Sequence, residues 1–134
     1  MVKLVIKKII ETNKENIEDI FSKHGRIFTF LNPVSYLQIR PHKNLYRDFD
    51  GLFADGSLLV RFIKIFYGET VQRYSFDMTS LAPKLFDYAS QKGKTIYLVG
   101  AKEGVADKAS EILCGFYKDL RVIGTHHGYN DSYE

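Results

Sequence analysis

The hexapeptide Leu52-Phe53-Ala54-Asp55-Gly56-Ser57 decides how the rest of the chain is interpreted. Its first half predicts the end of a short apolar strand, and its second half predicts a tight turn that leads into a helix. Gly56 tolerates a positive φ, and Ser57 is a candidate N-cap for the helix. Asp55 thus follows the carboxyl end of a strand, where open α/β sheets gather ligand-binding groups. Because Asp-Gly is also a common turn pair, the hexapeptide alone favours a structural role for Asp55.

The bulk composition indicates an ordinary globular protein. The 134 residues carry a formal net charge of +3, and their Lys and Arg residues are scattered, so we expect no nucleic-acid partner. A chain of this length is expected to form a single domain over residues 1–134. The single cysteine, Cys114, excludes an internal disulfide and fits a reducing compartment; we interpret it as a packing residue of a helix. Since we find neither a secretory signal nor a transmembrane run, we expect a cytoplasmic protein.

Apolar strands alternate with amphipathic helices along the chain. A β-rich start over residues 4–10 is followed by predicted strands at residues 27–31, 52–54, 95–99 and 120–124. Helices are predicted at residues 14–21, from Pro33 behind an Asn32 cap, at 58–66 up to Gly68, at 81–89 and at 105–116. This alternation predicts an α/β fold: a Rossmann-like, mostly parallel sheet with helices on both faces and right-handed crossovers.

The helix predicted over residues 58–66 is apolar almost all round, broken only by Arg61 and Lys64. Such a helix is buried in its own fold, or it lies against a partner or lipid. We favour burial or a subunit interface, which makes a homo-oligomer through this helix a prediction, and we rank a membrane surface below both.

Polar or glycine-rich residues follow most of the predicted strands, and in a parallel sheet these strand ends gather along one edge. Gly100 after the strand at 95–99 would let a phosphate approach the next helix N-terminus, where Lys102 adds a positive charge. A plain tight turn explains the same residues. His126 and His127 are neighbours that would point to opposite faces of a strand, with no convincing ligand spacing around them, so we expect no metal site.

Two stretches at the end of the chain carry a family resemblance. They are IYLVGAKEGVA at residues 96–106 and LRVIGTHHGY at residues 120–129. With the strand-end Asn32, the sequence Phe53-Ala54-Asp55-Gly56 and Arg73 after the apolar helix, they resemble the WecG/TagA/CpsF family over nearly the whole chain. These are bacterial glycosyltransferases that transfer N-acetylmannosamine or a related sugar, such as N-acetylmannosaminuronic acid, from a UDP donor to a polyprenyl-diphosphate-linked acceptor, in capsule, teichoic-acid and related polysaccharide synthesis.

The resemblance implies an inverting hexosyltransferase in which Asp55 is the catalytic base. It implies no metal and no cofactor besides the UDP-sugar donor, and a cytoplasmic location at the inner face of the membrane with peripheral association. The substrate-binding residues that it implies are Thr29, Asn32, Gly56, Arg73, Gly100, Lys102, His127, Gly128 and Tyr129.

The sequence departs from the family pattern at three places. Phe30 stands where members usually have Thr two residues before the asparagine, with Thr29 one place earlier. After Arg73, Phe76 replaces a glycine and Asp77 comes one position early. Members also continue beyond the Gly-Tyr loop, so we expect a truncated fold that lacks the C-terminal part. The alternative function is therefore a non-catalytic α/β module that binds a nucleotide or is completed by a partner chain.

Overall fold

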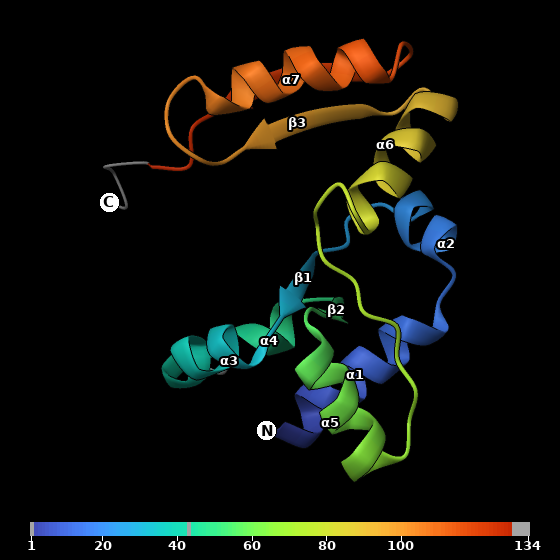
Figure 1. Cartoon of the computed structure of the whole chain (residues 1–134), viewed down its shortest axis with the longest axis vertical. Helices are drawn as coiled ribbons and strands as arrows, with labels where there is room; N and C mark the ends of the chain where they lie inside the picture. The colour runs from blue at the N-terminus through green and yellow to red at the C-terminus, as the bar shows by residue number, and fades with distance from the viewer. Residues whose placement is uncertain (1, 43, 130–134) are drawn as a thin grey trace. The chain divides into compact units, whose positions relative to one another are not determined.

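The computed structural model describes residues 2–42 and 44–129, and it divides the chain into two compact units, Met1–Ala82 and Pro83–Glu134 (Figure 1). The first unit contains α1 (Val2–Lys14), α2 (Ile17–Ser22), β1 (Phe28–Leu31), α3 (Pro33–Ile39), the 3-10 turn η1 (Arg40–His42), α4 (Leu45–Asp48), β2 (Gly51–Ala54) and α5 (Ser57–Tyr67). Helix α6 (Leu81–Gln91) crosses the boundary, and β3 (Thr95–Val99), α7 (Val105–Phe116) and β4 (Arg121–His126) follow. Over the described residues, no helix is both long and apolar enough to span a bilayer.

The chain starts with a helix, so the predicted β-rich start over residues 4–10 is wrong. Val5, Ile6 and Ile9 are buried on one side of α1, while Lys3 and Lys7 are exposed. Apolar residues recur here at the three- and four-residue spacing of a helix face. The β-branched content suggested a strand, but the spacing agrees with a helix whose apolar face packs on the first strand pair.

The first strand pair is parallel, and its second strand, β2, is covered on both faces. β1 pairs with β2 from Phe28 opposite Gly51 to Leu31 opposite Ala54. Leu52 of β2 belongs to an apolar cluster with α1 and α5, whereas Phe53 belongs to a second cluster with α2. Because successive strand residues point to opposite faces, helices lie on both sides of this pair. The predicted strands at residues 27–31 and 52–54 and the two covered faces are confirmed.

The two helices that follow these strands begin differently. Asn32 is the N-cap of α3 and Pro33 is its first residue, as predicted. Helix α5 has Gly56 at its N-cap position, with a φ of 103° and no capping side chain, so the prediction of Ser57 as N-cap is wrong. The positive φ that Gly56 permits turns the chain before Ser57, which becomes the first helical residue. Gly68 ends α5 in the left-handed conformation, as predicted.

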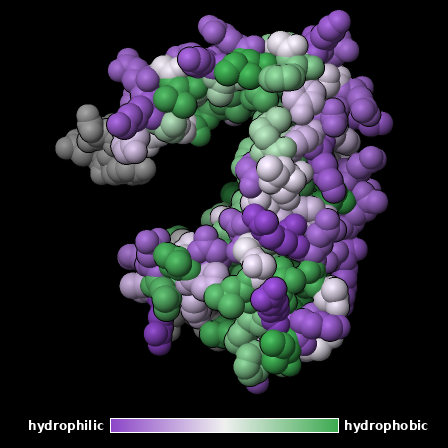
Figure 2. Space-filling model, in the orientation of Figure 1, coloured by the Kyte–Doolittle hydropathy of each residue, from purple (hydrophilic) through white to green (hydrophobic). Residues whose placement is uncertain are grey.

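Helix α5 is buried on one side only. Leu59 and Ile63 lie in the core, whereas Leu58, Ile65 and Phe66 are 68%, 74% and 69% exposed. Figure 2 shows hydrophobic side chains gathered over this helix. Burial within the fold therefore holds for half of the helix, and an interface through the other half stays a prediction.

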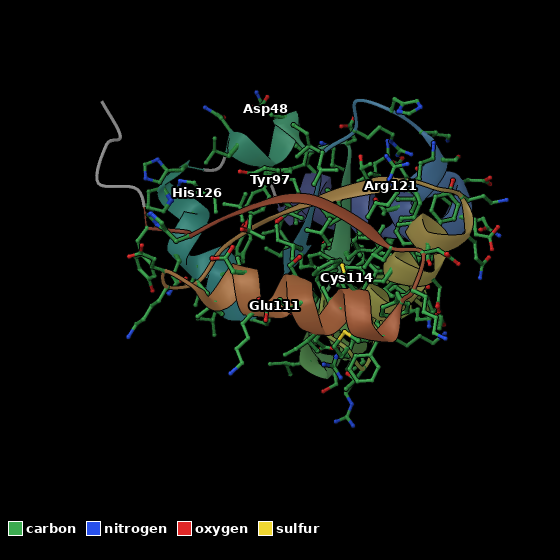
Figure 3. All side chains as sticks on the ribbon, turned by 90° about the horizontal axis from the view of Figure 1, so that it is seen from above. Asp48, Tyr97, Glu111, Cys114, Arg121 and His126 are labelled. Carbon is green, nitrogen blue, oxygen red and sulfur yellow. The ribbon has the colours of Figure 1, made fainter. Side chains whose placement is uncertain are left out.

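The second unit packs α7 along one face of a parallel β3–β4 pair (Figure 3). Strand Thr95–Val99 has its predicted bounds, and β4 reaches two residues beyond the predicted end at Gly124. Tyr97, Val99 and Ile123 are exposed on this pair. Cys114 is also exposed, so its interpretation as a packing residue is wrong. All strand pairs recorded among the described residues are parallel, consistent with a Rossmann-like α/β fold.

Candidate active site

Asp55 and Asn32 lie side by side at the carboxyl edge of the first strand pair. Each residue directly follows a strand, and the last paired residues are Leu31 and Ala54. The ladder continues one step further, because the Asp55 backbone N–H donates to the Leu31 carbonyl oxygen at 2.8 Å. Parallel pairing thus fixes the two residues as neighbours, although 23 positions separate them in the sequence.

A third segment brings Arg73 to the same edge. The Tyr74 backbone N–H donates to the Ala54 carbonyl oxygen at 2.9 Å, so the chain around Tyr74 runs beside the end of β2. Tyr74 is buried and its ring meets Phe53 edge-on at 5.4 Å, which anchors this segment to the strand. Arg73 precedes this anchor and is exposed. Three backbone segments therefore meet at one edge, and they carry Asp55, Asn32 and Arg73.

The side chains of this edge offer distinct chemistry. The Asn32 Oδ1 accepts the Ser35 backbone N–H at 2.8 Å, and the Ser35 hydroxyl accepts the Asn32 backbone N–H at 3.0 Å. This capping box fixes the Asn32 side chain and leaves its Nδ2 as a donor for a ligand hydroxyl. Asp55 is half-buried and can accept a proton, and Gly56 offers a close approach because it has no side chain.

Thr29 does not reach this edge. It lies within β1 opposite Leu52, three residues before Asn32. Asp77, the aspartate that comes one position early after Arg73, also has a local role. Its carboxylate accepts hydrogen bonds from the Ser75 hydroxyl at 2.6 Å and from the Thr79 backbone and hydroxyl. These bonds, chiefly that from Ser75, lower the pKa of Asp77 to about 2, with a smaller contribution from the charge of Arg73.

The second unit brings its own candidate residues together. The Gly100 backbone N–H donates to the His126 carbonyl oxygen at 3.0 Å, and the Gly128 backbone N–H donates to the Ala101 carbonyl oxygen at 2.8 Å. A Cβ on Gly128 would lie 3.0 Å from the Cα of Gly100, so the two loops meet backbone to backbone. Ala101 has a φ of 59°, an uncommon conformation for a residue with a side chain. The loops after β3 and β4 thus form one junction, joined by backbone hydrogen bonds.

The charge around this junction is mixed. Lys102 is exposed, and the α7 N-terminus has Gly104 as N-cap without a capping side chain. Glu103 and Asp107 line a small cavity of about 180 Å³ together with His126 and His127. Two carboxylates beside one lysine weaken the attraction for a diphosphate at this helix end. Tyr129 is 66% exposed.

The described residues hold no cluster of three or more His, Cys, Asp or Glu side chains that could bind a metal ion. The His126 ring makes a local hydrogen bond, because its Nδ1 lies 2.7 Å from the His127 carbonyl oxygen.

Comparison with known proteins shows the family of this chain. The Glycosyl transferase WecG/TagA/CpsF family matches the chain over residues 3–134. The chain belongs to this family. A UDP-Gal:alpha-D-GlcNAc-diphosphoundecaprenol beta-1,4-galactosyltransferase of Shigella boydii is 31% identical over 108 residues, which make up 81% of this chain. The chain spans 45% of the length of that relative.

Beside the edge of this WecG/TagA/CpsF chain lies an apolar groove that the sequence analysis missed. It has a volume of about 450 Å³, and α1, α3, α5 and the end of β1 line it. Asn32 is one of its lining residues, so the groove adjoins the candidate site. The helical spacing of Val2, Val5 and Ile6 was the available signal, and it was overlooked because this segment was predicted as a strand.

Proposed function

We propose that this chain provides the catalytic carboxylate of a sugar transfer from a UDP donor to a hydroxyl of a polyprenyl-diphosphate-linked acceptor. The observation that carries the proposal is the position of Asp55, which follows β2 between Asn32 and the segment of Arg73. Membership of a glycosyl transferase family supports the reaction class. The acceptor is supported by the name of the relative, which specifies a GlcNAc-diphosphoundecaprenol.

In the proposed reaction, Asp55 takes the proton of the acceptor hydroxyl as the oxygen attacks the anomeric carbon. The new glycosidic bond forms, the bond to the UDP oxygen breaks, and UDP leaves with the electron pair, so the anomeric configuration inverts. Asn32 Nδ2 donates to a sugar hydroxyl, Gly56 leaves room for the sugar, and Arg73 offers a positive charge to a phosphate. For the second unit, the family resemblance implies that the loops at Gly100, Lys102 and residues 127–129 bind the nucleotide, and we keep this as part of the proposal.

The donor sugar is the finer part of the proposal. The resemblance implies N-acetylmannosamine, whereas the name of the relative specifies galactose. A panel of UDP-N-acetylmannosamine, UDP-galactose and UDP-N-acetylglucosamine, each supplied with a GlcNAc-diphosphate-polyprenyl acceptor, tests the choice. Product from one of these donors is expected, and no product from any donor would contradict the proposal.

The assignment of Asp55 is tested in the same assay with Asp55→Asn. Loss of the general base is expected to slow transfer by about 100- to 10,000-fold. Asp48→Asn is the matched control, because Asp48 is an exposed aspartate of the same unit and belongs to the triplet Asp48-Phe49-Asp50. Full activity of Asp55→Asn would disprove the assignment. A comparable loss of activity in Asp48→Asn would show that the loss is not specific to Asp55.

A second candidate function is a module completed by a partner chain. The exposed apolar residues on the outer side of α5 and on β3–β4 favour it. Sedimentation velocity over a range of concentrations tests this candidate. A monomer at all concentrations, with transfer activity intact, would argue against it.

A further inference from the structure

The apolar groove of the first unit has a closed floor and an open rim. Val5, Ile6, Leu31 and Leu59 form the floor and are all less than a tenth exposed. The rim includes Leu37 of α3 and Leu58 of α5, which are 64% and 68% exposed. Its volume of about 450 Å³ lies in the range of roughly 300–1,000 Å³ that is typical of small-ligand sites. The groove is therefore large enough for part of an organic ligand.

The chemistry of the lining selects an apolar ligand. No charged side chain lines the groove, and its polar groups are confined to the amide of Asn32 and the hydroxyl of Tyr36. The Asn32 Oδ1 is already used by the cap of α3. A sugar, a nucleotide or a phosphate would lose its water contacts here without enough replacement hydrogen bonds. A branched hydrocarbon chain forms no hydrogen bonds with water, so it would lose none on entering the groove.

The groove is continuous with the candidate active site. Asn32 belongs both to the groove and to the edge that carries Asp55. Leu58 and Leu59 lie in the first turn of α5, which begins directly after Asp55 and Gly56. A ligand with its polar end at Asp55 would thus place an attached apolar chain in the groove.

From this continuity we propose that the groove binds the first isoprene units of the acceptor's polyprenyl chain. The inference rests on the proposed function, because that function supplies an acceptor with an isoprenoid chain. It adds a lipid-binding subsite on α1, α3 and α5, beside the sugar-binding edge. Leu58 is exposed at the rim, so the rest of a long chain leaves the groove beside this residue.

Calorimetric titration of the chain with farnesyl diphosphate tests the groove without requiring transfer. We expect Leu58→Asp and Leu37→Asp to weaken binding by about tenfold or more, because a carboxylate at the rim loses hydration beside the bound chain. Ile65→Asp is the matched control, because Ile65 is exposed on the same helix and does not line the groove. It should bind as the unchanged chain does, and all three substituted positions are exposed enough to leave folding intact.

Two further ligands and a sedimentation measurement decide what the groove recognises. Inorganic diphosphate should bind equally to the unchanged chain and to Leu58→Asp, since it has no chain to place. Dodecyl diphosphate, which carries the same head group on a linear chain, should bind more weakly than farnesyl diphosphate. Equal binding of farnesyl diphosphate by Leu58→Asp and Ile65→Asp would overturn the proposal, as would tighter binding of dodecyl diphosphate. Sedimentation showing a dimer of the unchanged chain that Leu58→Asp dissociates would also overturn it, because a second copy would then cover the groove.

The fate of the proposed function is distinguishable from that of the groove. If farnesyl diphosphate binds through Leu58 and no donor gives product, the groove stands and the transferase activity fails. If GlcNAc-diphosphate carrying a farnesyl group and GlcNAc-diphosphate carrying a methyl group are acceptors with equal KM, the activity stands and the groove fails.

Discussion

Each strand pair places an aromatic ring opposite a glycine, but the two rings are held very differently. Phe28 lies opposite Gly51 in the first unit, and Tyr97 lies opposite Gly124 in the second. In both pairs, a Cβ added to the glycine would come closer than 3.0 Å to ring atoms. The local pairing is thus the same, since an aromatic ring covers the backbone that a glycine leaves bare.

The surroundings of the two rings differ. Phe28 packs on Phe53 at 5.7 Å, and the guanidinium of Arg26 lies 4.7 Å from its ring centroid. Tyr97 is 55% exposed, and its hydroxyl donates to the Thr125 carbonyl oxygen at 3.3 Å. The difference teaches that cover from other elements, and not strand pairing itself, decides how much of such a ring is exposed.

The largest expected difference between the units comes from shortening an apolar side chain of a strand. Leu52→Ala removes a side chain that is 0% exposed between α1 and α5, so we expect it to lower the free energy of unfolding by about 2–5 kcal/mol. Val99→Ala removes a side chain that is 66% exposed, and we expect a loss of about 0.5 kcal/mol or less. Urea titrations followed by circular dichroism measure both. Similar losses of unfolding free energy in the two variants would contradict the stated difference in cover between the two strand pairs.

The two glycines give a finer comparison. Gly51→Ala pushes a methyl group against Phe28 and the Thr12 hydroxyl, both of which are held in place, and we expect a loss of about 1–3 kcal/mol. For Gly124→Ala, the three atoms nearest to the added Cβ all belong to the ring of Tyr97. Because that ring is 55% exposed and its hydrogen bond to the Thr125 carbonyl oxygen is long, at 3.3 Å, the ring can shift, and we expect a loss below about 1 kcal/mol. The same urea titrations apply, and a larger loss for Gly124→Ala would contradict this interpretation.

The smallest effect concerns the ion pair that positions Arg26 over Phe28. The guanidinium donates two hydrogen bonds of 2.8 Å to the Glu15 carboxylate, and these bonds are the main reason that the pKa of Glu15 falls from 4.5 to about 2. A pKa that is lower in the folded chain contributes stability above pH 4.5, and this contribution is lost as the pH falls toward 2. Since the pair is partly exposed, we expect about 1 kcal/mol or less.

Stability curves between pH 7 and pH 2 measure this contribution. Glu15→Gln should lower stability at pH 7 and flatten the decline below pH 4.5. Glu11→Gln is the control, because Glu11 pairs with Lys7 at 3.7 Å with both side chains largely exposed, so its curve should match that of the unchanged chain. Identical curves for the two variants would show that the Arg26 pair has no special role.

Local signals predicted much of the fold. The apolar runs at residues 28–31 and 95–99, the Asn32–Pro33 helix start and the Gly68 helix end are each decided by a few neighbouring residues. The N-terminal helix was missed because its β-branched residues were weighed above their spacing. The Ser57 cap was missed because a positive φ at Gly56 moves the helix start by one residue.

The candidate site depended on contacts that the sequence does not display. Asp55 and Asn32 could be placed together once parallel strands were assumed. The position of Arg73 rests on the hydrogen bond from Tyr74 to Ala54, twenty residues earlier, and no local pattern predicts that bond. The apolar groove likewise requires three helices to converge, so it could be found only in three dimensions.

The central claim is that Asp55 acts on the reacting hydroxyl and not on the binding of substrates. The direct measurement compares the donor affinity and the single-turnover transfer rate of Asp55→Asn with those of Asp48→Asn. The account predicts that Asp55→Asn binds the donor within about threefold of the control while transferring the sugar at least about 100-fold more slowly. Equal transfer rates, or a loss of rate that is fully explained by weaker binding, would contradict it.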